Sequence, residues 1–477
     1  MDLRYINKQG DIMKLRYIKI GFLVLFLCFV IYALIGLLPF IGSPYVSVET
    51  SASFSMNNFF GQYEIPERVM LLEDSRESFF HRVNLITKAE KRILFTTYAF
   101  NGGETSDIII GALLYAAERG VNVTLLHNAI GGAMPGNYIN VLAAHDNIDV
   151  YRFNRFNFFQ PQFINAALHD KYMVVDDIYL ILGGRNLGDR YYAPDGFTGR
   201  QTLDREVLVF NTDPDFNGSI ADVTDYFHDK INSDHTAQYN REQGRGWETE
   251  KNRFIIRYLE HQNRLGLTQF DYHEGTVGVN RITLITNNFD TPKNESIVAY
   301  NLMRMTQNSQ VIVAQSPYVS LTGGSFEIFA ETVMGRDVTL LTNSLASSPN
   351  LPSFSSYLVS RQRIVNTGIS LYEFQDTHTS IHGKTYLFDG RLTAIGSFNL
   401  NERSIRSDTE SMLIIDSERF HDITLEAINH QIARSLRVNS DNRYDLISTV
   451  EEAHVSLVKR FVFTAAGHIF RFLWFMF

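Results

Sequence analysis

The sequence repeats itself, because three segments of its first half return in the same order 213 to 215 residues later. Matches in one order at nearly one offset indicate a duplicated domain. The repeated segments are 123–128 with 338–343, His169–Lys171 with His382–Lys384, and Gly183–Leu187 with Gly396–Leu400. The chain is therefore expected to build one unit twice.

Short apolar runs alternate with amphipathic segments inside each copy. The pattern predicts helices over 76–89, 107–119, 294–307 and 325–334, and strands over 92–97, 122–127, 310–315 and 337–342. Two pairs of short strands should follow, 172–175 with 179–182 and 385–388 with 393–395. Four- to six-residue Val/Ile/Leu runs between such helices are typical of a sheet covered on both faces. We expect an α/β fold with domains over 67–235 and 276–445, joined by a polar linker over 236–275.

Each copy also carries the motif H-x-K-x4-D-x6-G-[GS]-x-N. It falls on His169, Lys171, Asp176, Gly183, Gly184 and Asn186, and again on His382, Lys384, Asp389, Gly396, Ser397 and Asn399. Alternate residues of an extended chain point to the same face, so each histidine and its lysine should project together. One His-x-Lys alone would more often be a structural pair, but two copies with identical spacing indicate a shared site.

These residue types suit phosphoryl chemistry. A phosphodiester is anionic, so a site that cleaves it must neutralise its oxygens, and lysine and asparagine donors can do so. One neutral imidazole can attack phosphorus while the other protonates the departing alkoxide. The sequence offers no cluster with metal-ligand spacing, and its single cysteine, Cys28, excludes a cysteine-rich zinc site. We expect activity without a metal or a cofactor.

An uncharged run over 20–40 predicts a transmembrane helix, because 21 residues at about 1.5 Å each cross a bilayer core. Five basic residues precede it and none follows before Arg68, so residues 1–19 should be cytoplasmic and the rest extracytoplasmic. A cleaved signal peptide is disfavoured by the length of the run and by the poor cleavage site at 39–41. Bulky Leu27 disfavours lipidation at Cys28. Residues 41–66 should form a juxtamembrane linker.

The C-terminal segment 446–477 gives a second, weaker membrane signal. Residues 461–477 are very aromatic but are interrupted by His468 and Arg471, so a helix lying in the interface fits better than a span. The alternative is a helix docked on the protein's own core. The net charge of −9, from 43 Lys and Arg against 52 Asp and Glu, argues against a nucleic-acid partner.

The doubled motif resembles that of the phospholipase D superfamily, and it looks most similar to bacterial cardiolipin synthases of the non-polytopic type. The resemblance extends from about Leu71 to Asp416 and includes the segments 183–189, 316–318, 341–346 and 399–404. It implies two domains packed about a pseudo-twofold axis, with the active site between them.

The resemblance also implies a role for each motif residue. The nucleophile falls on His169 and the general acid on His382, while Lys171, Lys384, Asn186, Asn399 and Ser397 fall on phosphate binders. Asp176 and Asp389 should support their loops. A carboxylate on the following strand should hold each histidine. Glu410 fits this role in the second copy, and either Glu206 or Asp204 fits it in the first. Gly184 stands where many relatives have serine.

The leading interpretation is a membrane-anchored phosphatidyltransferase of the bacterial cytoplasmic membrane that acts on phosphatidylglycerol or phosphatidylethanolamine. A phospholipase D would differ only in using water as acceptor, and sequence does not separate the two. A nuclease of the same superfamily fits less well with the negative charge and the two membrane signals. A non-enzymatic scaffold is disfavoured by two intact motifs.

Overall fold

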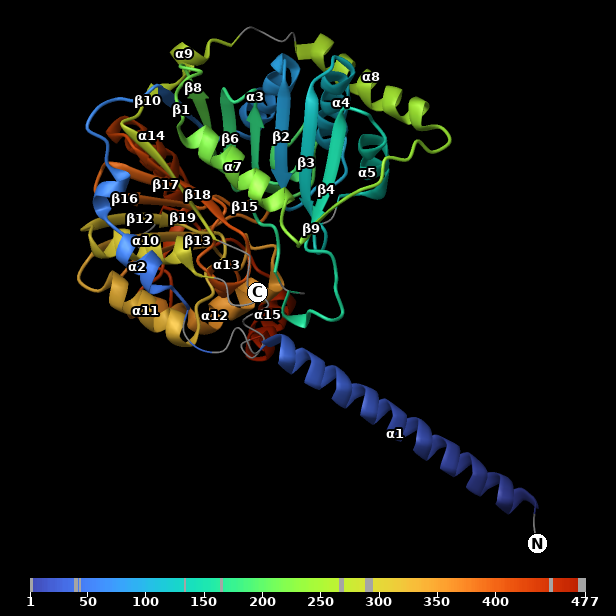
Figure 1. The fold of residues 1–477 in the computed structure, drawn as a ribbon. Coiled ribbons are helices and arrows are strands. Elements are labelled where there is room, and N and C mark those ends of the chain that lie inside the picture. The colour runs from blue at the N-terminus through green and yellow to red at the C-terminus, as the bar shows by residue number, and fades with distance from the viewer. Residues whose placement is uncertain are drawn as a thin grey trace.

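Two mixed sheets, one from each sequence repeat, form the body of the molecule, and a long helix projects from it (Figure 1). The computed structural model describes residues 3–37, 42, 44–132, 134–163, 166–265, 270–287, 295–445 and 449–470. The described elements have the α/β character expected from the alternating pattern.

The first sheet has nine strands in the order β10-β1-β8-β6-β5-β2-β3-β4-β9. Its parallel centre pairs β2 with β3 and β3 with β4. The strands are β1 (Glu67–Leu72), β2 (Arg92–Thr97), β3 (Asn122–Asn128), β4 (Ile148–Phe153), β5 (Tyr172–Val175), β6 (Tyr179–Gly183), β8 (Glu206–Asn211), β9 (Thr236–Gln238) and β10 (Val277–Gly278).

The second sheet repeats this plan with eight strands in the order β11-β18-β17-β16-β12-β13-β14-β19. The parallel centre is again three consecutive strands, β12, β13 and β14. The strands are β11 (Arg281–Thr286), β12 (Val311–Gln315), β13 (Asp337–Asn343), β14 (Ser370–Phe374), β16 (Thr385–Phe388), β17 (Leu392–Gly396), β18 (Ser411–Asp416) and β19 (Ser435–Arg437). The shared strand order confirms the duplication.

Helices of corresponding position accompany each sheet. The first copy has α3 (Ser75–Lys88), α4 (Glu104–Glu118), α5 (Gly136–Ala143), α6 (Asp189–Tyr192) and α7 (Ser219–Ile231). The second has α10 (Ile297–Gln307), α11 (Gly323–Val333), α12 (Leu351–Val365), α13 (Glu402–Arg406) and α14 (Glu418–Ile432). The expected helices and strands agree with these bounds to within three residues where they are described.

The two copies exchange contacts immediately before each motif histidine. Strand β15 (Thr379–Ile381), which ends one residue before His382, pairs in parallel with β7 (Gln201–Leu203) of the first copy. The symmetric contact is a parallel bridge between Leu168, one residue before His169, and Thr409 of the second copy. A buried apolar cluster that includes Leu182 and Ile395 extends across both sheets. The pseudo-twofold arrangement thus brings both motifs to one junction.

Residues 236–275 do more than link the copies. They contain β9, the 19-residue helix α8 (Trp247–Leu265) and α9 (Tyr272–Gly275). Phe254 and Tyr258 of α8 are fully buried in the core of the first domain. The segment between the copies therefore contains packed secondary structure, and its polar composition conceals an apolar stripe at helical spacing.

The predicted juxtamembrane linker 41–66 also packs on the body where it is described. It contains α2 (Val48–Ser53) and the short 3-10 helix η2 (Met56–Phe59), and Phe59 is buried in the core of the second domain. Serine hydroxyls cap both elements. The described part of this segment therefore belongs to the folded body.

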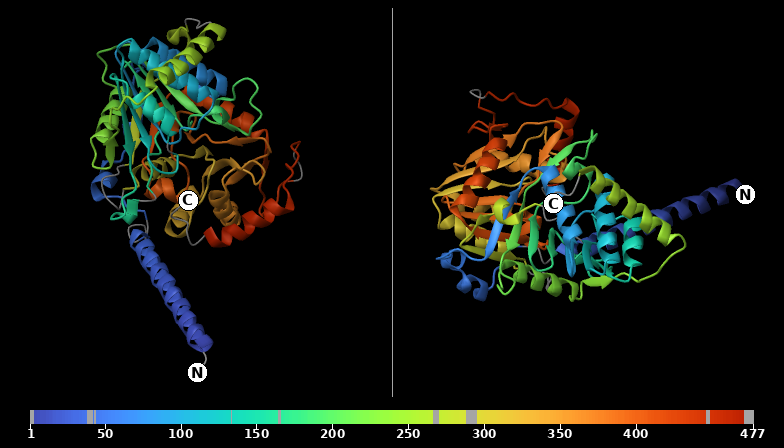
Figure 2. Two further views of the ribbon diagram at one scale, coloured as in Figure 1. Left: turned by 90° about the vertical axis from the view of Figure 1, so that its right-hand side faces the viewer. Right: turned by 90° about the horizontal axis from the view of Figure 1, so that it is seen from above.

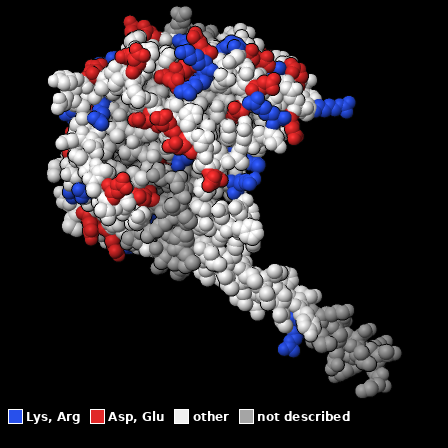
Figure 3. Space-filling model, viewed as in Figure 1, with Lys and Arg blue, Asp and Glu red and all other residues white. Residues whose placement is uncertain are grey.

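Helix α1 (Leu3–Leu37) projects from the body as a single rod (Figure 2). Its segment Arg16–Gly36 is long and apolar enough to cross a membrane, and none of it is buried inside the protein. The white part of the rod carries only basic groups, near its grey N-terminal end, whereas acidic and basic groups mix over the visible face of the body (Figure 3). Residues 38–40 of the predicted span lie outside the described residues.

The C-terminal helix α15 (Leu457–Phe470) docks on α12 through one face. Phe463 is buried there, and Gly467 lies against the backbone of Ser355, where a side-chain carbon would stand 2.6 Å from the carbonyl oxygen. The opposite face exposes Leu457, Val458 and Phe461. The structure therefore shows the docked interpretation for one face, and contact of the other face with the membrane stays a prediction. Residues 471–477 lie outside the described part of the chain.

Candidate active site

His169 and His382 lie at the junction of the two domains, and each is held by a carboxylate from the other copy. His169 Nδ1 lies 3.0 Å from Glu410 Oε1, and His382 Nδ1 lies 2.5 Å from Asp204 Oδ2. All four side chains are buried. With Nδ1 engaged in both rings, Nε2 is the atom that can act on a substrate, although Lys384 Nζ lies 3.1 Å from Nε2 of His382 in the empty site.

This crossing corrects the expected pairing of histidines with carboxylates of their own copy. Gly183 pairs with Glu206, whereas Gly396 pairs with Met412. The register therefore makes Met412 the counterpart of Glu206, and Glu410 the counterpart of Asp204. The cross-domain contacts at Leu168 and at β15 then carry each histidine to the opposite carboxylate.

Glu206 belongs to a separate buried charge cluster. Its carboxylate accepts a 3.0 Å hydrogen bond from Arg185 Nε and closer ones from Arg82 and Ser78. Arg185 and Phe398 hold corresponding positions, as do Glu206 and Met412, so the second copy is apolar where the first is charged. Glu206 therefore serves the interior of the first domain and contacts neither histidine.

The two motif lysines lie against their own histidines. Lys171 Nζ donates to the carbonyl oxygen of His169, and Lys384 Nζ donates to that of His382 at 2.5 Å. Burial lowers the pKa of Lys171 to about 8 and that of Lys384 to about 7. A bound phosphate would restore both charges, because an opposite charge nearby favours the protonated amine.

Burial and the neighbouring lysines lower the pKa of both histidines, to about 4 for His382 and well below the usual 6.5 for His169. Their carboxylates differ. Burial raises the pKa of Glu410 to about 7, whereas for Asp204 the charges of His382 and Lys384 outweigh burial and hold the pKa below its usual range. Asp204, beside His382, therefore stays ionised at neutral pH, whereas Glu410, beside His169, is only partly ionised.

The remaining polar motif residues differ in what they contact. Asn186 is already engaged, accepting from the Ala99 amide at 3.1 Å and donating to Tyr191 at 3.1 Å. Asn399 faces the cavity, and its buried amide oxygen has no partner among the described residues. Because this oxygen only accepts hydrogen bonds, a contact with a phosphoryl oxygen would have to come from the N–H groups of the Asn399 amide.

Ser397 supports a carboxylate in place of the expected contact with phosphate. Its hydroxyl donates to Glu410 Oε2 at 2.5 Å. At the corresponding Gly184 a side-chain carbon would stand only 2.4 Å from Asp204 Oδ1 and 3.1 Å from Lys384. The first copy carries glycine because the crossed Asp204 and Lys384 occupy that space.

Asp176 and Asp389 occupy the hairpin turns between the paired strands and do not line the cavity. Asp176 accepts from the backbone amides of 90–92, and Asp389 accepts from those of Gln310 and Val311. Both adopt positive φ, of 54° and 49°. They hold turns together, as the resemblance implies.

A cavity of about 390 Å³ opens beside the two histidines. It is lined by groups that sequence reasoning had not selected, including Tyr98, Tyr318, Arg190 and Arg403. The repeat offset would have found the arginines, because Arg403 lies 213 residues after Arg190. Arg190 and Arg403 therefore line the space between the domains, while the buried Lys171 and Lys384 lie against the backbone of the two histidines.

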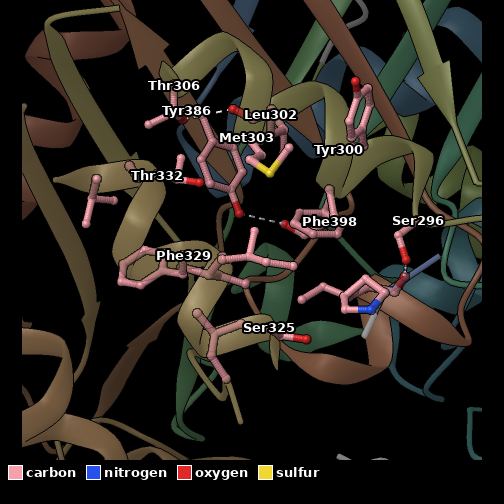
Figure 4. Close-up of a pocket in the computed structure, with 18 of the residues that line it drawn as sticks. Ser296, Tyr300, Leu302, Met303, Thr306, Ser325, Phe329, Thr332, Tyr386 and Phe398 are labelled. Atoms are coloured by element: carbon pink, nitrogen blue, oxygen red, sulfur yellow. Dashed lines mark hydrogen bonds between the residues drawn. The ribbon is translucent and has the colours of Figure 1, made fainter. Parts of the chain in front are cut away.

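A second cavity, of about 340 Å³, lies between α10, α11 and the second sheet, and its lining is almost wholly apolar (Figure 4). Tyr386 and Phe398 line it, and the Tyr386 hydroxyl donates to the Phe398 carbonyl at 3.3 Å. It contains no motif histidine or lysine. The chemistry therefore belongs to the interdomain cavity.

The fold gathers His169, Asp408 and Glu410 so that one atom of each lies within 4.8 Å of the others. This grouping was not visible in the spacing of the sequence. Each member already has a partner, because Asp408 binds Arg403 and Glu410 binds both His169 and Ser397. Burial raises the pKa of Asp408 to about 7, which weakens it further as a metal ligand.

Comparison with known proteins gives consistent relatives. A family model described as "Cardiolipin synthase, PLD-like domain" matches residues 83–230 and 302–432. An uncharacterised protein of Helicobacter pylori strain J99 is 27% identical over 400 residues, 74% of this chain and 76% of that protein. Cardiolipin synthase C of Escherichia coli K12 is 25% identical over 391 residues, covering 73% of this chain and 81% of that protein.

The fold also resembles a solved structure. Phosphatidylserine synthase of Haemophilus influenzae superposes with a TM-score of 0.63 at 15% identity, covering 86% of this chain and 95% of that one. The two segments matched by the family model fall in the two structural copies and together exceed half of the chain. The chain therefore belongs to the cardiolipin synthase, PLD-like domain family of the phospholipase D superfamily, a superfamily of phosphatidyltransferases and phosphodiesterases.

Proposed function

We propose that this protein is a membrane-anchored phosphatidyltransferase that transfers a phosphatidyl group from one glycerophospholipid to the hydroxyl of another, giving a cardiolipin-like product. The crossed pairs His169–Glu410 and His382–Asp204 around one cationic cavity carry the proposal. The similarity to cardiolipin synthase C and the apolar helix α1 support a lipid substrate at a membrane.

The environments of the two histidines favour different roles. His169 is the nucleophile, because its lowered pKa keeps the imidazole neutral and Glu410 fixes the proton on Nδ1. His382 is the general acid, because the ionised Asp204 stabilises the imidazolium once an anionic phosphate has entered.

The reaction then takes two balanced steps. Nε2 of His169 attacks phosphorus, the bond from phosphorus to the head-group oxygen breaks, and His382 gives its proton to that oxygen. In the second step His382 takes the proton of the acceptor hydroxyl, whose oxygen attacks phosphorus and releases His169. Lys171, Lys384 and Asn399 hold the phosphoryl oxygens throughout.

The charge of the cavity favours a lipid acceptor. Arg190 and Arg403 line the cavity beside the two histidines, so it can hold the phosphate of an anionic acceptor beside that of the donor. Phosphatidylglycerol would serve as both. Water in place of the lipid hydroxyl would make the protein a phospholipase D, which is the second candidate.

The test is to incubate detergent-purified full-length protein with phosphatidylglycerol, with and without added phosphatidylethanolamine or glycerol, and to identify the products by mass spectrometry. A product with two phosphatidyl groups supports transfer, whereas phosphatidic acid alone identifies the hydrolase. His169→Ala and His382→Ala should each remove nearly all turnover, because nucleophile and acid act as one unit. Near-normal turnover in either variant contradicts the two-histidine mechanism.

A further inference from the structure

A short loop between β4 and the first motif exposes an aromatic surface. All six residues of the segment 155–160 are exposed, and its three phenylalanines, Phe156, Phe158 and Phe159, are 61%, 59% and 89% exposed. We refer to residues 155–160 as the phenylalanine loop. Contiguous exposed apolar side chains mark an interaction surface, since a soluble protein rarely leaves them in water.

The phenylalanine loop lies against the outer end of the apolar segment of α1. The ring of Phe158 stacks on that of Tyr32, with centroids 4.9 Å apart. Just beyond the loop, Pro161 packs on Gly36, where a side-chain carbon would stand 3.0 Å from the Pro161 carbonyl oxygen. The loop and the helix therefore meet over one turn.

This contact fixes the height of the loop relative to the predicted span. Tyr32 lies four residues before the end of the apolar segment at Gly36, which is about 6 Å along the helix axis. A ring stacked on Tyr32 therefore lies level with the last turn of the span. That level corresponds to the interfacial zone of a bilayer, where aromatic side chains concentrate.

We propose that the phenylalanine loop inserts into the interfacial region of the leaflet from which α1 emerges, so that its partner is the lipid surface. The proposal deepens the proposed function and rests on α1 lying in a membrane. Phe158 and Phe159 enter the acyl boundary, and Arg155, which is also exposed, contacts lipid phosphates.

The loop is tied to the catalytic cavity at its base. Asn154, in a left-handed conformation with φ of 53°, donates to the carbonyls of Phe163 and Ala166 and so closes the loop. The next amide, that of Ala167, donates to Asp408, which lines the cavity. Seating the loop on a membrane therefore places the cavity close to its lipid substrates.

Helix α15 extends the same side of the molecule. Figure 1 and the left view of Figure 2 place α15 and the start of α1 at the same end of the body, although the turned view separates them. Lys459 donates to the carbonyl of Ala346, and the adjoining Pro349 and Asn350 line the catalytic cavity. The exposed apolar face of α15 is thus connected to a segment that lines the cavity.

The experiment uses the full chain in proteoliposomes of phosphatidylglycerol and phosphatidylethanolamine. Cys28 is the only cysteine, so Cys28→Ser provides a background in which one added cysteine takes an environment-sensitive fluorophore. The test site is Phe159→Cys. The matched control is Tyr63→Cys, an aromatic residue that is 81% exposed and lies in the segment before β1.

Lipids carrying a nitroxide near the glycerol backbone should quench the label at position 159 several-fold more strongly than the label at position 63. Equal quenching at the two positions would overturn the proposal. The emission of the label at position 159 could instead shift to the blue as the protein concentration rises, without quenching by the lipid nitroxide. That result would assign the loop to a contact between copies of the protein and would also overturn the proposal. Quenching does not depend on turnover, so this result stands apart from the test of the enzyme's activity.

A kinetic measurement adds a functional readout. The triple variant Phe156→Ser/Phe158→Ser/Phe159→Ser should lose turnover on vesicle lipid while keeping turnover on a short-chain phosphatidylglycerol below its micelle concentration. Equal losses on both substrates would mean that the loop serves the fold, and would contradict a lipid partner.

Discussion

Asp204 and Glu206 lie two residues apart, yet they do different work. Asp204 holds His382 across the domain junction, whereas Glu206 balances Arg82 and Arg185 inside the first domain. Both are fully buried carboxylates, so burial alone does not distinguish them. What separates a positioning residue for the reaction from a structural one is the partner each carboxylate meets.

We therefore expect Asp204→Asn and Glu206→Gln to have opposite signatures. Asp204→Asn should lower kcat by about 10²–10⁴-fold with little change in Tm, because His382 loses the anion that stabilises its protonated form. Glu206→Gln should cost about 3–5 kcal/mol of stability, since two buried guanidinium groups lose their counter-ion. Lipid turnover and thermal unfolding, measured on both variants, check the pair. A stable, fully active Asp204→Asn would refute the crossed arrangement.

The pH profile should report the two buried lysines. Their pKa values of about 7 and about 8 mean that the empty site loses positive charge as the pH rises through this range. Glu410 and Asp408, with pKa values of about 7, gain negative charge over the same range. Both changes weaken binding of an anionic phosphate, so kcat/KM should fall above pH 7.

The value of kcat should fall less, because bound phosphate raises the pKa of both lysines. The measurement is kcat/KM and kcat between pH 5 and pH 9 at fixed ionic strength. A value of kcat/KM that stays level to pH 9 would contradict neutral lysines in the empty site.

The motif predicted which residues gather but not how they pair. His169, His382 and both lysines meet because the repeat spacing is symmetric, and sequence is sufficient for that. The crossing of Glu410 and Asp204 arises from contacts between distant segments, at Leu168 and at β15, which no local spacing records. Arg190 and Arg403 could have been predicted from the sequence, because they are separated by the same 213 residues that separate the two motifs.

At the scale of elements, α8 shows how composition can hide packing. The helix lies on α4 so closely that a side-chain carbon at Gly111 would stand 2.1 Å from the Phe254 carbonyl oxygen. Many Glu, Arg, Asn and Gln residues surround its buried positions, so the segment has the composition of a linker. Strands of consecutive Val, Ile and Leu have no such ambiguity, and their predicted bounds agree with the structure.

Phe254→Ala should destabilise the first domain by about 3–5 kcal/mol, because a fully buried ring leaves a cavity against α4. The active site lies outside α8, so turnover at low temperature should change little. Ile256→Ala, at a position 53% exposed on the same helix, is the matched control. Thermal unfolding of both variants distinguishes the outcomes, and equal Tm values would show that α8 is a dispensable linker.

At the scale of the whole molecule, the two copies form one site that neither could form alone. Each histidine takes its carboxylate from the partner copy, and the cavity takes one arginine from each. Duplication also allowed the interiors to diverge, with a charged cluster at Arg185 and an apolar one at Phe398. The pseudo-symmetry is thus retained at the junction and relaxed in the interiors of the two domains.

The orientation of this assembly follows from the charges that flank α1. Five basic residues precede the apolar segment and none follows before Arg68, so we expect residues 1–19 in the cytoplasm and the catalytic body outside. If translation began at Met13, Lys14, Arg16 and Lys19 would still keep the bias.

Single cysteines in the Cys28→Ser background test this orientation in spheroplasts. A membrane-impermeant maleimide should label Tyr63→Cys, which is highly exposed and follows the span, without permeabilisation. Lys8→Cys, which precedes the span, should react only after the membrane is opened. A cytoplasmic protein with a reactive cysteine reports whether the spheroplasts are sealed. Labelling of position 8 with protection of position 63 would place the active site in the cytoplasm, because no other helix in the described residues is long and apolar enough to return the chain across the membrane.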